Sequence, residues 1–265
     1  MSPAGTKSPC LSRSFVDNLN PERCLKVLEI ARKYDIGSVE RRCQRYLVRK
    51  LPVAAADPFE NWTSFQLYYK KEGLASLAFR TCPEYLAPWA FYAIAVQIFA
   101  KLDKKPLEEV TDPLPSLDTM DKDTVYQMLV LRHVNQKVLA EWNALIDKFY
   151  STKCPKSSSS RDKCARAHTT FDRQSPLYIS PSEGIYDPLQ LIIPRVKKHA
   201  VWKGSTHGSA RNYWCYQCSS FLQSITQEKV QEIHLCLLSA VRELGLPRGT
   251  PFHSPSSTRA NSPSW

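Results

Sequence analysis

Apolar residues recur along this chain every three or four positions, the spacing that places them on one face of an α-helix. Between Asn20 and Leu51 they define two short helices separated by a turn before Gly37. Asn20 and Pro21 supply an N-cap and a first helical residue. The apolar stripes of the two helices consist of Leu25, Leu28 and Ala31, and of Val39, Cys43, Tyr46 and Leu47. The pattern predicts a helix pair at residues 20–51.

The same spacing predicts a helical bundle at residues 52–151. A helix is expected at residues 57–69, and a short one at residues 74–81. Residues 89–102 are apolar almost all round, which is typical of a helix buried at the centre of a bundle. Asp121 or Asp123 is expected to cap a longer helix that runs to about residue 150. The stripe of the first of these helices is aromatic and consists of Phe59, Trp62, Phe65 and Tyr69.

The composition changes after residue 150. Residues 152–188 contain four consecutive serines and several prolines, so we predict a long loop. Residues 189–247 form a C-terminal helical region, with a short helix that Pro194 interrupts, a helix at 213–225 and a last helix capped by Thr226. Residues 1–19 and 248–265 are expected to be a flexible N-terminal segment and a disordered tail. Strand patterns are absent, and the predicted fold class is all-α, an irregular helical bundle with a long internal loop and disordered termini.

The composition is that of a folded protein. Hydrophobic residues make up 43% of the 265 residues and aromatic residues 11%, which is enough to bury a core and excludes wholesale disorder. No apolar run approaches the roughly 20 residues that cross a bilayer, and the first residues do not resemble a signal peptide. We therefore expect an intracellular protein, cytoplasmic or nuclear, without a membrane partner. Its nine cysteines are then expected to be reduced thiols.

Two pairs of cysteines stand where a metal site could form. Cys215 and Cys218 are two residues apart, a spacing that lets two thiolates bind one tetrahedral ion. Cys154 and Cys164 lie in the predicted loop, with His168 as a reserve ligand. A structural zinc site formed by the four cysteines would explain how that loop is held. The alternative is that these cysteines are packing residues, and it is the default because a single Cys-x-x-Cys pair is common and the upstream spacing is unusual.

The chain is basic, with 36 Lys and Arg against 25 Asp and Glu, a net charge of +11. Clusters occur at Arg41, Arg42 and Arg45, and at Lys197 and Lys198. They allow an alternative function as a basic helical nucleic-acid-binding protein related to transcription, in which residues 21–47 form a helix-turn-helix. Solvated helix faces explain the same charges, and we do not expect nucleic acid to be the partner.

Catalytic signatures are missing from the sequence. It has only eight glycines and contains no Gly-rich phosphate loop, no HExxH and no GxSxG motif. The sequence therefore predicts no enzyme, no catalytic residue and no cofactor other than the zinc ion considered above.

The stretch NPERCLKVLEIARKYDIGSVERRCQRYL at residues 20–47, with its "KYDI" turn, resembles the helix pair that closes a BTB/POZ domain. Three later features, in the same order along the chain, resemble the C-terminal part of the BTB-domain proteins of mushroom-forming fungi. They are the segment Leu86–Ala93, the pair Cys215 and Cys218, and the step Gly245-Leu246-Pro247. The strand-rich half of a BTB domain is not found before Asn20.

The resemblance implies a truncated BTB-related protein that is a non-catalytic adaptor with protein partners. In a complete BTB domain the helix pair packs on a sheet. Without the sheet, we expect the apolar face of the pair to dock on the aromatic helix at residues 57–69.

Overall fold

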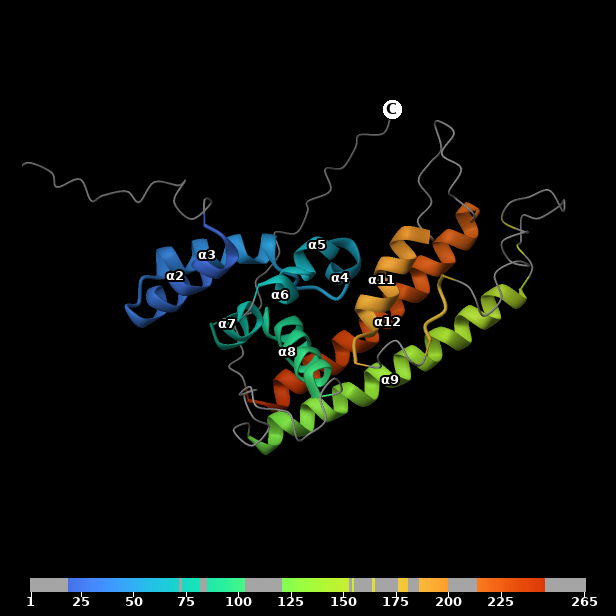
Figure 1. Ribbon diagram of the computed structural model, residues 1–265. Coiled ribbons are helices and arrows are strands. Elements are labelled where there is room, and N and C mark those ends of the chain that lie inside the picture. Colours follow the sequence, from blue (N-terminus) through green and yellow to red (C-terminus); the bar gives the residue numbers. More distant parts are fainter. Residues whose placement is uncertain are drawn as a thin grey trace, which may run out of the picture.

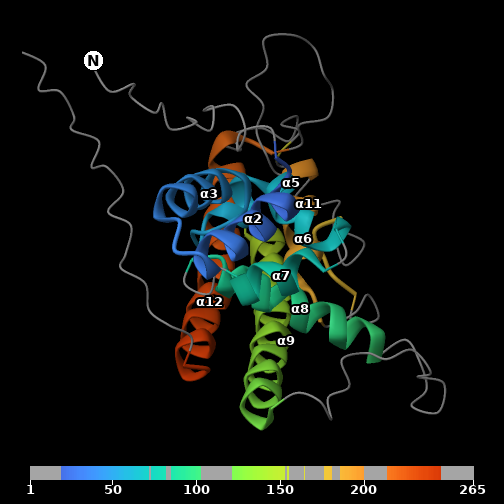
Figure 2. The same cartoon turned by 90° about the vertical axis from the view of Figure 1, so that its left-hand side faces the viewer.

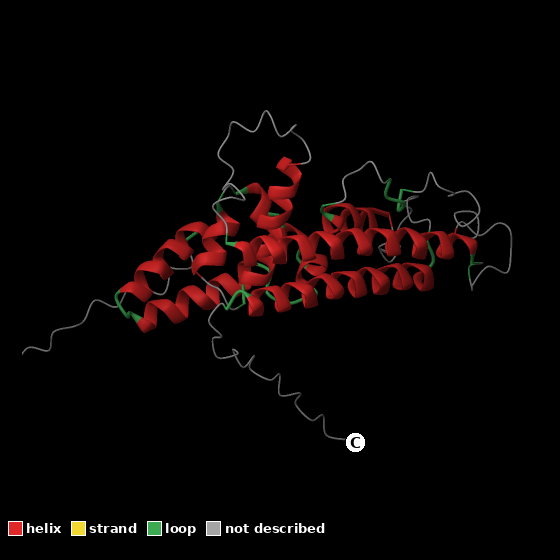
Figure 3. Ribbon diagram, turned by 90° about the horizontal axis from the view of Figure 1, so that it is seen from below, coloured by secondary structure: helices red, strands yellow, loops and turns green. Residues whose placement is uncertain are grey.

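The computed structural model of the chain is an all-α protein (Figure 1). It describes residues 19–71, 73–81, 85–102, 121–152, 154, 164, 176–180, 186–199 and 214–245. Within these ranges every regular element is a helix, and no strand is present (Figure 3). The predicted N-terminal segment, apart from Leu19, and the predicted tail lie outside the described residues. The fold class predicted from the sequence is therefore confirmed.

The helices begin and end close to the predicted positions. Their bounds are α2 Pro21–Lys33, α3 Gly37–Lys50, α4 Asp57–Glu60, α5 Trp62–Phe65, α6 Leu67–Lys70, α7 Leu74–Thr81, α8 Ala87–Leu102, α9 Lys122–Ser151, α11 Pro188–His199 and α12 Tyr216–Glu243. Asn20 caps α2 by accepting a hydrogen bond of 2.8 Å from the Arg23 amide. Asp121 caps α9 in the same way, at 2.7 Å from the Thr124 amide.

Helix α8 is the centre of the fold. It contacts α6 and α7 as well as α9 and α12, which explains why its sequence is apolar all round. Residues 89–93 are buried almost completely. The Trp89 ring packs edge-on against Phe65 and stacks on the imidazole of His234 in α12, with centroids 5.1 Å apart. A single core therefore joins the N-terminal and C-terminal halves of the described chain.

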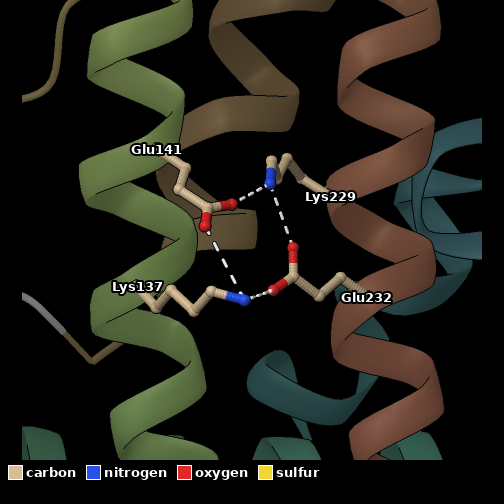
Figure 4. Close-up of polar contacts among 4 residues, drawn as sticks. All are labelled: Lys137, Glu141, Lys229 and Glu232. Carbon is tan, nitrogen blue, oxygen red and sulfur yellow. Dashed lines mark hydrogen bonds and ion pairs between the residues drawn. The ribbon is translucent and has the colours of Figure 1, made fainter.

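The two long helices, α9 and α12, run side by side in opposite directions (Figures 1 and 2). Apolar packing is supplemented by a ring of alternating charges between them, made of Lys137, Glu141, Lys229 and Glu232 (Figure 4). Lys137 lies 2.8 Å from Glu232, and Lys229 lies 3.0 Å from the same carboxylate while also bonding Glu141. The hydrogen bond from Lys137 lowers the pKa of Glu232, so this carboxylate is ionised at neutral pH.

The "KYDI" stretch forms the turn between α2 and α3 through a Schellman motif. Asp35 adopts the left-handed conformation, with a φ of 53°. The Asp35 amide then reaches the Arg32 carbonyl at 3.2 Å, and the Ile36 amide reaches the Ala31 carbonyl at 2.8 Å. These hydrogen bonds pair carbonyls in the last turn of α2, and the chain changes direction within three residues.

We expect Asp35→Gly to raise the free energy of unfolding by about 0.5–1 kcal/mol, because glycine occupies the left-handed region without a Cβ penalty. Asp35→Val should lower it by about 1–2 kcal/mol, because a β-branched residue is strained at this φ. Urea unfolding of both variants measures the difference. Equal stabilities of the glycine and valine variants would contradict the assigned turn conformation.

Three details differ from the expectations. The aromatic segment at residues 57–70 is not one helix but three single turns, α4, α5 and α6, of which α5 places Phe65 against Trp89 and Tyr92 of α8. Thr226 does not cap a new helix. It lies inside α12 and donates a hydrogen bond of 2.6 Å to the Leu222 carbonyl, so one helix runs through. Likewise α11 continues through Pro194, because Ile192, Ile193 and Val196 anchor it in the core.

The α2–α3 pair also docks elsewhere than expected. Its main contact outside the pair is with α7, not with the aromatic segment. Arg32 donates a hydrogen bond to the Thr81 carbonyl at the end of α7, and Arg80 lies 3.6 Å from Glu29. The small residues Ala75 and Ala78 on the buried face of α7 allow a close approach of the helices, which the bulky aromatic segment does not offer. The pair therefore projects from one end of the molecule (Figure 1).

Candidate metal centre

Four cysteines from distant parts of the sequence converge beside the ends of the two long helices. Cys154 follows the last residue of α9 by three positions, and Cys215 is the N-cap of α12. Cys218 lies in the first turn of that helix, on the same side as Cys215. Cys164 comes from the segment between the helices. Because α9 and α12 are antiparallel, the end of one meets the start of the other, which brings both cysteine pairs together.

The sulfur atoms are close enough to bind one ion. The Sγ atoms of all four residues lie within 4.8 Å of one another. Those of Cys154 and Cys215 are 3.6 Å apart, and those of Cys154 and Cys218 are 3.9 Å apart. A disulfide bond requires a sulfur–sulfur distance of about 2.05 Å, so these are free thiols. The convergence that the sequence analysis offered as an alternative to simple packing is thus present in the fold.

The four cysteines differ in how far they are exposed to solvent. Cys154, Cys164 and Cys218 are buried, whereas Cys215 is half-buried. A hydrogen bond with Cys164, together with burial, raises the pKa of the Cys218 thiol, which favours the neutral form of this side chain. The N-terminus of α12 points at the same place and carries the partial positive charge of a helix start. A divalent metal ion bound there would favour the thiolate forms of the cysteines, which would then release their thiol protons.

Aromatic side chains pack on one another at the same helix ends, close in sequence to the cysteines. Trp214, directly before Cys215, is buried and packs on Phe149 and Tyr150 at centroid distances of 5.1 Å and 5.8 Å. Phe221, one turn into α12, stacks on Phe149 at 5.8 Å. These ring contacts hold the start of α12 against the end of α9, on both sides of Cys215. Sequence reasoning did not assign them to the site, because aromatic residues at helical spacing are usually plain core.

The remaining cysteines in the described chain lie elsewhere. Cys24 and Cys43 are buried between α2 and α3, where the Cys24 thiol lies 3.7 Å from the Cys43 carbonyl. Cys236 is half-buried on α12 and has its pKa raised by burial alone. These three behave as packing residues. The reserve ligand His168 lies outside the described residues.

The candidate basic surface is divided in two. Arg41, Arg42 and Arg45 lie on α3, at one end of the molecule, whereas Lys197 and Lys198 lie on α11, on the far side of α4–α8 (Figure 1). The Lys197 ammonium packs over the Phe59 ring at 5.5 Å and donates to the Glu60 carbonyl. Burial lowers its pKa. Lys197 is thus largely an internal contact between α11 and α4.

A buried carboxylate was missed by the sequence analysis. Asp187 is the N-cap of α11 and accepts hydrogen bonds from the Tyr92 hydroxyl at 2.7 Å and the Gln190 amide at 3.1 Å. Burial raises its pKa to about 6, against the opposing effect of these bonds. The Asp187-Pro188 step could have identified it, since an aspartate before a proline is a typical helix start.

None of the helices in the described part of the chain combines the length and the apolar character needed to cross a membrane. Comparisons of the chain with protein-family models, with curated proteins and with solved structures found no match.

Proposed function

We propose that this protein is a non-catalytic adaptor that binds another protein through the turn between α2 and α3. The observation that carries the proposal is the exposure of large apolar side chains at this turn. Tyr34 is 66% exposed, Ile30 55% and Ile36 43%. Three such residues within seven positions, at the tip of a pair that projects from the bundle, are typical of a recognition surface.

The charge around the turn indicates what kind of partner fits. Residues 20–51 contain nine Lys and Arg but only four Asp and Glu. Lys33 lies over the Tyr34 ring at 5.8 Å, and the Arg41 guanidinium lies beside Gly37, next to Ile36. An apolar centre with a basic rim favours a partner segment that combines apolar with acidic residues. The resemblance of this helix pair to the end of a BTB/POZ domain supports the same assignment to protein binding.

The arrangement of the basic residues gives less support to nucleic-acid binding. Duplex recognition needs one continuous basic face that neutralises several phosphates. Among the described residues the two candidate clusters lie on helices that do not adjoin, and one of their lysines packs on an aromatic ring. We therefore expect only weak binding to DNA or RNA that disappears at physiological salt.

Selection from a random peptide library tests the adaptor function with the full chain. We expect enrichment of peptides that combine acidic and apolar residues. The double substitution Tyr34→Ser and Ile36→Ser should weaken the binding of those peptides at least about tenfold, because it removes the centre of the surface. Serine is a favourable residue at the start of α3, so the helix pair should stay folded, as circular dichroism can verify.

The matched control is Tyr126→Ser with Leu129→Ser, which removes equally exposed apolar side chains from α9. It should leave peptide binding unchanged. Selected peptides that bind the turn variant as well as the unaltered protein would contradict the proposed surface. Sub-micromolar binding of a random duplex at physiological salt, lost on Arg41→Gln, Arg42→Gln and Arg45→Gln together, would replace the adaptor function with nucleic-acid binding.

A further inference from the structure

We propose that Cys154, Cys164, Cys215 and Cys218 bind one structural zinc ion that fastens the segment between α9 and α12 to the ends of these helices. This inference goes beyond the adaptor function and does not depend on it, since the cysteines and the α2–α3 turn lie at opposite ends of the molecule (Figure 1).

The distances are those of a tetrahedral thiolate site. Zinc–sulfur bonds of about 2.3 Å at tetrahedral angles place the sulfurs about 3.8 Å apart. The two measured contacts of Cys154, at 3.6 Å and 3.9 Å, bracket this value, and the remaining sulfurs lie within 4.8 Å. The side chains are therefore arranged for an ion without rearrangement of the helices. Four sulfurs this close surround a space that suits one ion and not a multinuclear cluster.

The ligand set selects the metal. Four cysteine thiolates are soft donors, which calcium, magnesium and manganese do not prefer. A tetrahedral site with four sulfurs binds zinc or a single iron, and zinc, which has no redox chemistry, suits a site with a purely structural role. All four positions are occupied by protein, so no site is left for water or substrate. The site therefore holds the chain together and does not perform catalysis.

The N-terminus of α12 partly compensates the negative charge of a zinc ion bound to four thiolates. Zinc with four thiolates has a net charge of −2, which is costly in a buried place unless positive groups face it. Here the start of α12, a 28-residue helix, supplies a partial positive charge, and Cys215 is its N-cap residue. Thiolates beside a helix N-terminus are stabilised in the same way. The contacts of Phe149 with Trp214 and Phe221 hold the helix ends that carry the ligands in place.

A structural role follows from the position of the ligands in the sequence. Between α9 and α12 the chain contains more than sixty residues, of which α11 and residues 176–180 pack on the bundle. Closing a segment of this length costs conformational entropy. An ion that binds Cys154 at one end, Cys215 and Cys218 at the other and Cys164 in between offsets this cost, because binding free energy at a site that exists only in the folded chain is folding free energy.

Metal analysis of the full-length protein tests the proposal. The protein is purified under reducing conditions without chelators or added metal. We expect about one zinc ion per chain, which a thiol-modifying mercurial releases. The double variant Cys215→Ser and Cys218→Ser should contain almost none. Cys236→Ser is the matched control, since this cysteine is half-buried on the same helix but remote from the cluster, and it should keep its zinc.

A second measurement keeps the test independent of whether the cysteine variant folds. Cobalt added to metal-free unaltered protein should give the visible absorption of a tetrahedral thiolate complex, and zinc should abolish it. Protein without metal and with four reduced cluster thiols, a disulfide between cluster cysteines, or iron in place of zinc would each overturn the proposal. A zinc content that is the same in the double variant as in the unaltered protein would overturn the ligand assignment. Failure of peptide selection at the α2–α3 turn would leave these results unchanged, so the two proposals are tested separately.

Discussion

Trp142→Ala is expected to lower the free energy of unfolding by about 4–5 kcal/mol, the upper range for removal of a buried tryptophan. Trp142 is fully buried at the middle of α9, and its Nε1 donates a hydrogen bond of 2.9 Å to the Leu177 carbonyl. The substitution leaves a large cavity and removes the hydrogen bond to the Leu177 carbonyl. Next to it, Asn143 forms two hydrogen bonds with the backbone of Ile179, so this part of α9 holds the described segment 176–180 on the bundle.

Urea unfolding followed by circular dichroism measures the effect. Trp142→Phe keeps part of the volume but lacks the donor, and its cost should be intermediate, about 1–3 kcal/mol. Tyr126→Ala, at an exposed position on the same helix, should change stability by no more than about 0.5 kcal/mol. If Trp142→Ala lowered the free energy of unfolding as little as Tyr126→Ala does, the described packing of residues 176–180 on α9 would be contradicted.

Replacing Asp187 is expected to change both the stability of the fold and its dependence on pH. Burial raises the pKa of Asp187 to about 6 in the folded protein, against about 3.9 in an unfolded chain. The folded state thus binds this proton more tightly than the unfolded state does. The contribution of Asp187 to stability is therefore greatest at low pH and falls as the pH rises from about 4 to about 6.

Asp187→Asn cannot ionise but keeps the acceptor for Tyr92 and Gln190. Its stability should lack this fall between pH 4 and 6, so that at pH 7 it equals or exceeds that of the unaltered protein. Asp187→Ala removes the cap of α11 and the acceptor for the Tyr92 hydroxyl proton, which should cost about 2–3 kcal/mol at pH 7. Thermal unfolding of the three proteins across this pH range provides the comparison. An asparagine variant that retains the pH dependence would show that another group causes it.

The sequence predicted those parts of the fold that depend on local signals. Helix spacing and caps identified α2, α3, α7, α8 and α9 within a few residues, because Asn20, Asp121 and the apolar faces act on their own segments. It could not predict that Thr226 and Pro194 lie inside helices. Both residues favour a helix end when considered locally, but the buried residues on either side hold the helix continuous.

The candidate metal site likewise has a part that local signals predict and a part that depends on tertiary packing. Spacing alone could place Cys215 and Cys218 on one side of a helix start. That Cys154 and Cys164 would meet them depended on the antiparallel packing of α9 and α12, which is a long-range property. The docking of α2 on α7 was mispredicted for a similar reason, since which apolar surface a helix covers depends on shape and not on periodicity. The exposed turn at Tyr34 and Ile36 was also missed, because apolar residues beside a helix stripe are normally expected in the core.

The ring of charges between α9 and α12 (Figure 4) also favours one register of the two helices. If α12 slid along α9 by one helical turn in one direction, Glu232 would face Glu141. A slip of one turn in the other direction would place Lys229 opposite Lys137. Either slip replaces attraction with repulsion between like charges. The ring thus acts at a distance on the cysteine cluster, because the same register brings Cys154, after the end of α9, next to Cys215 and Cys218 at the start of α12.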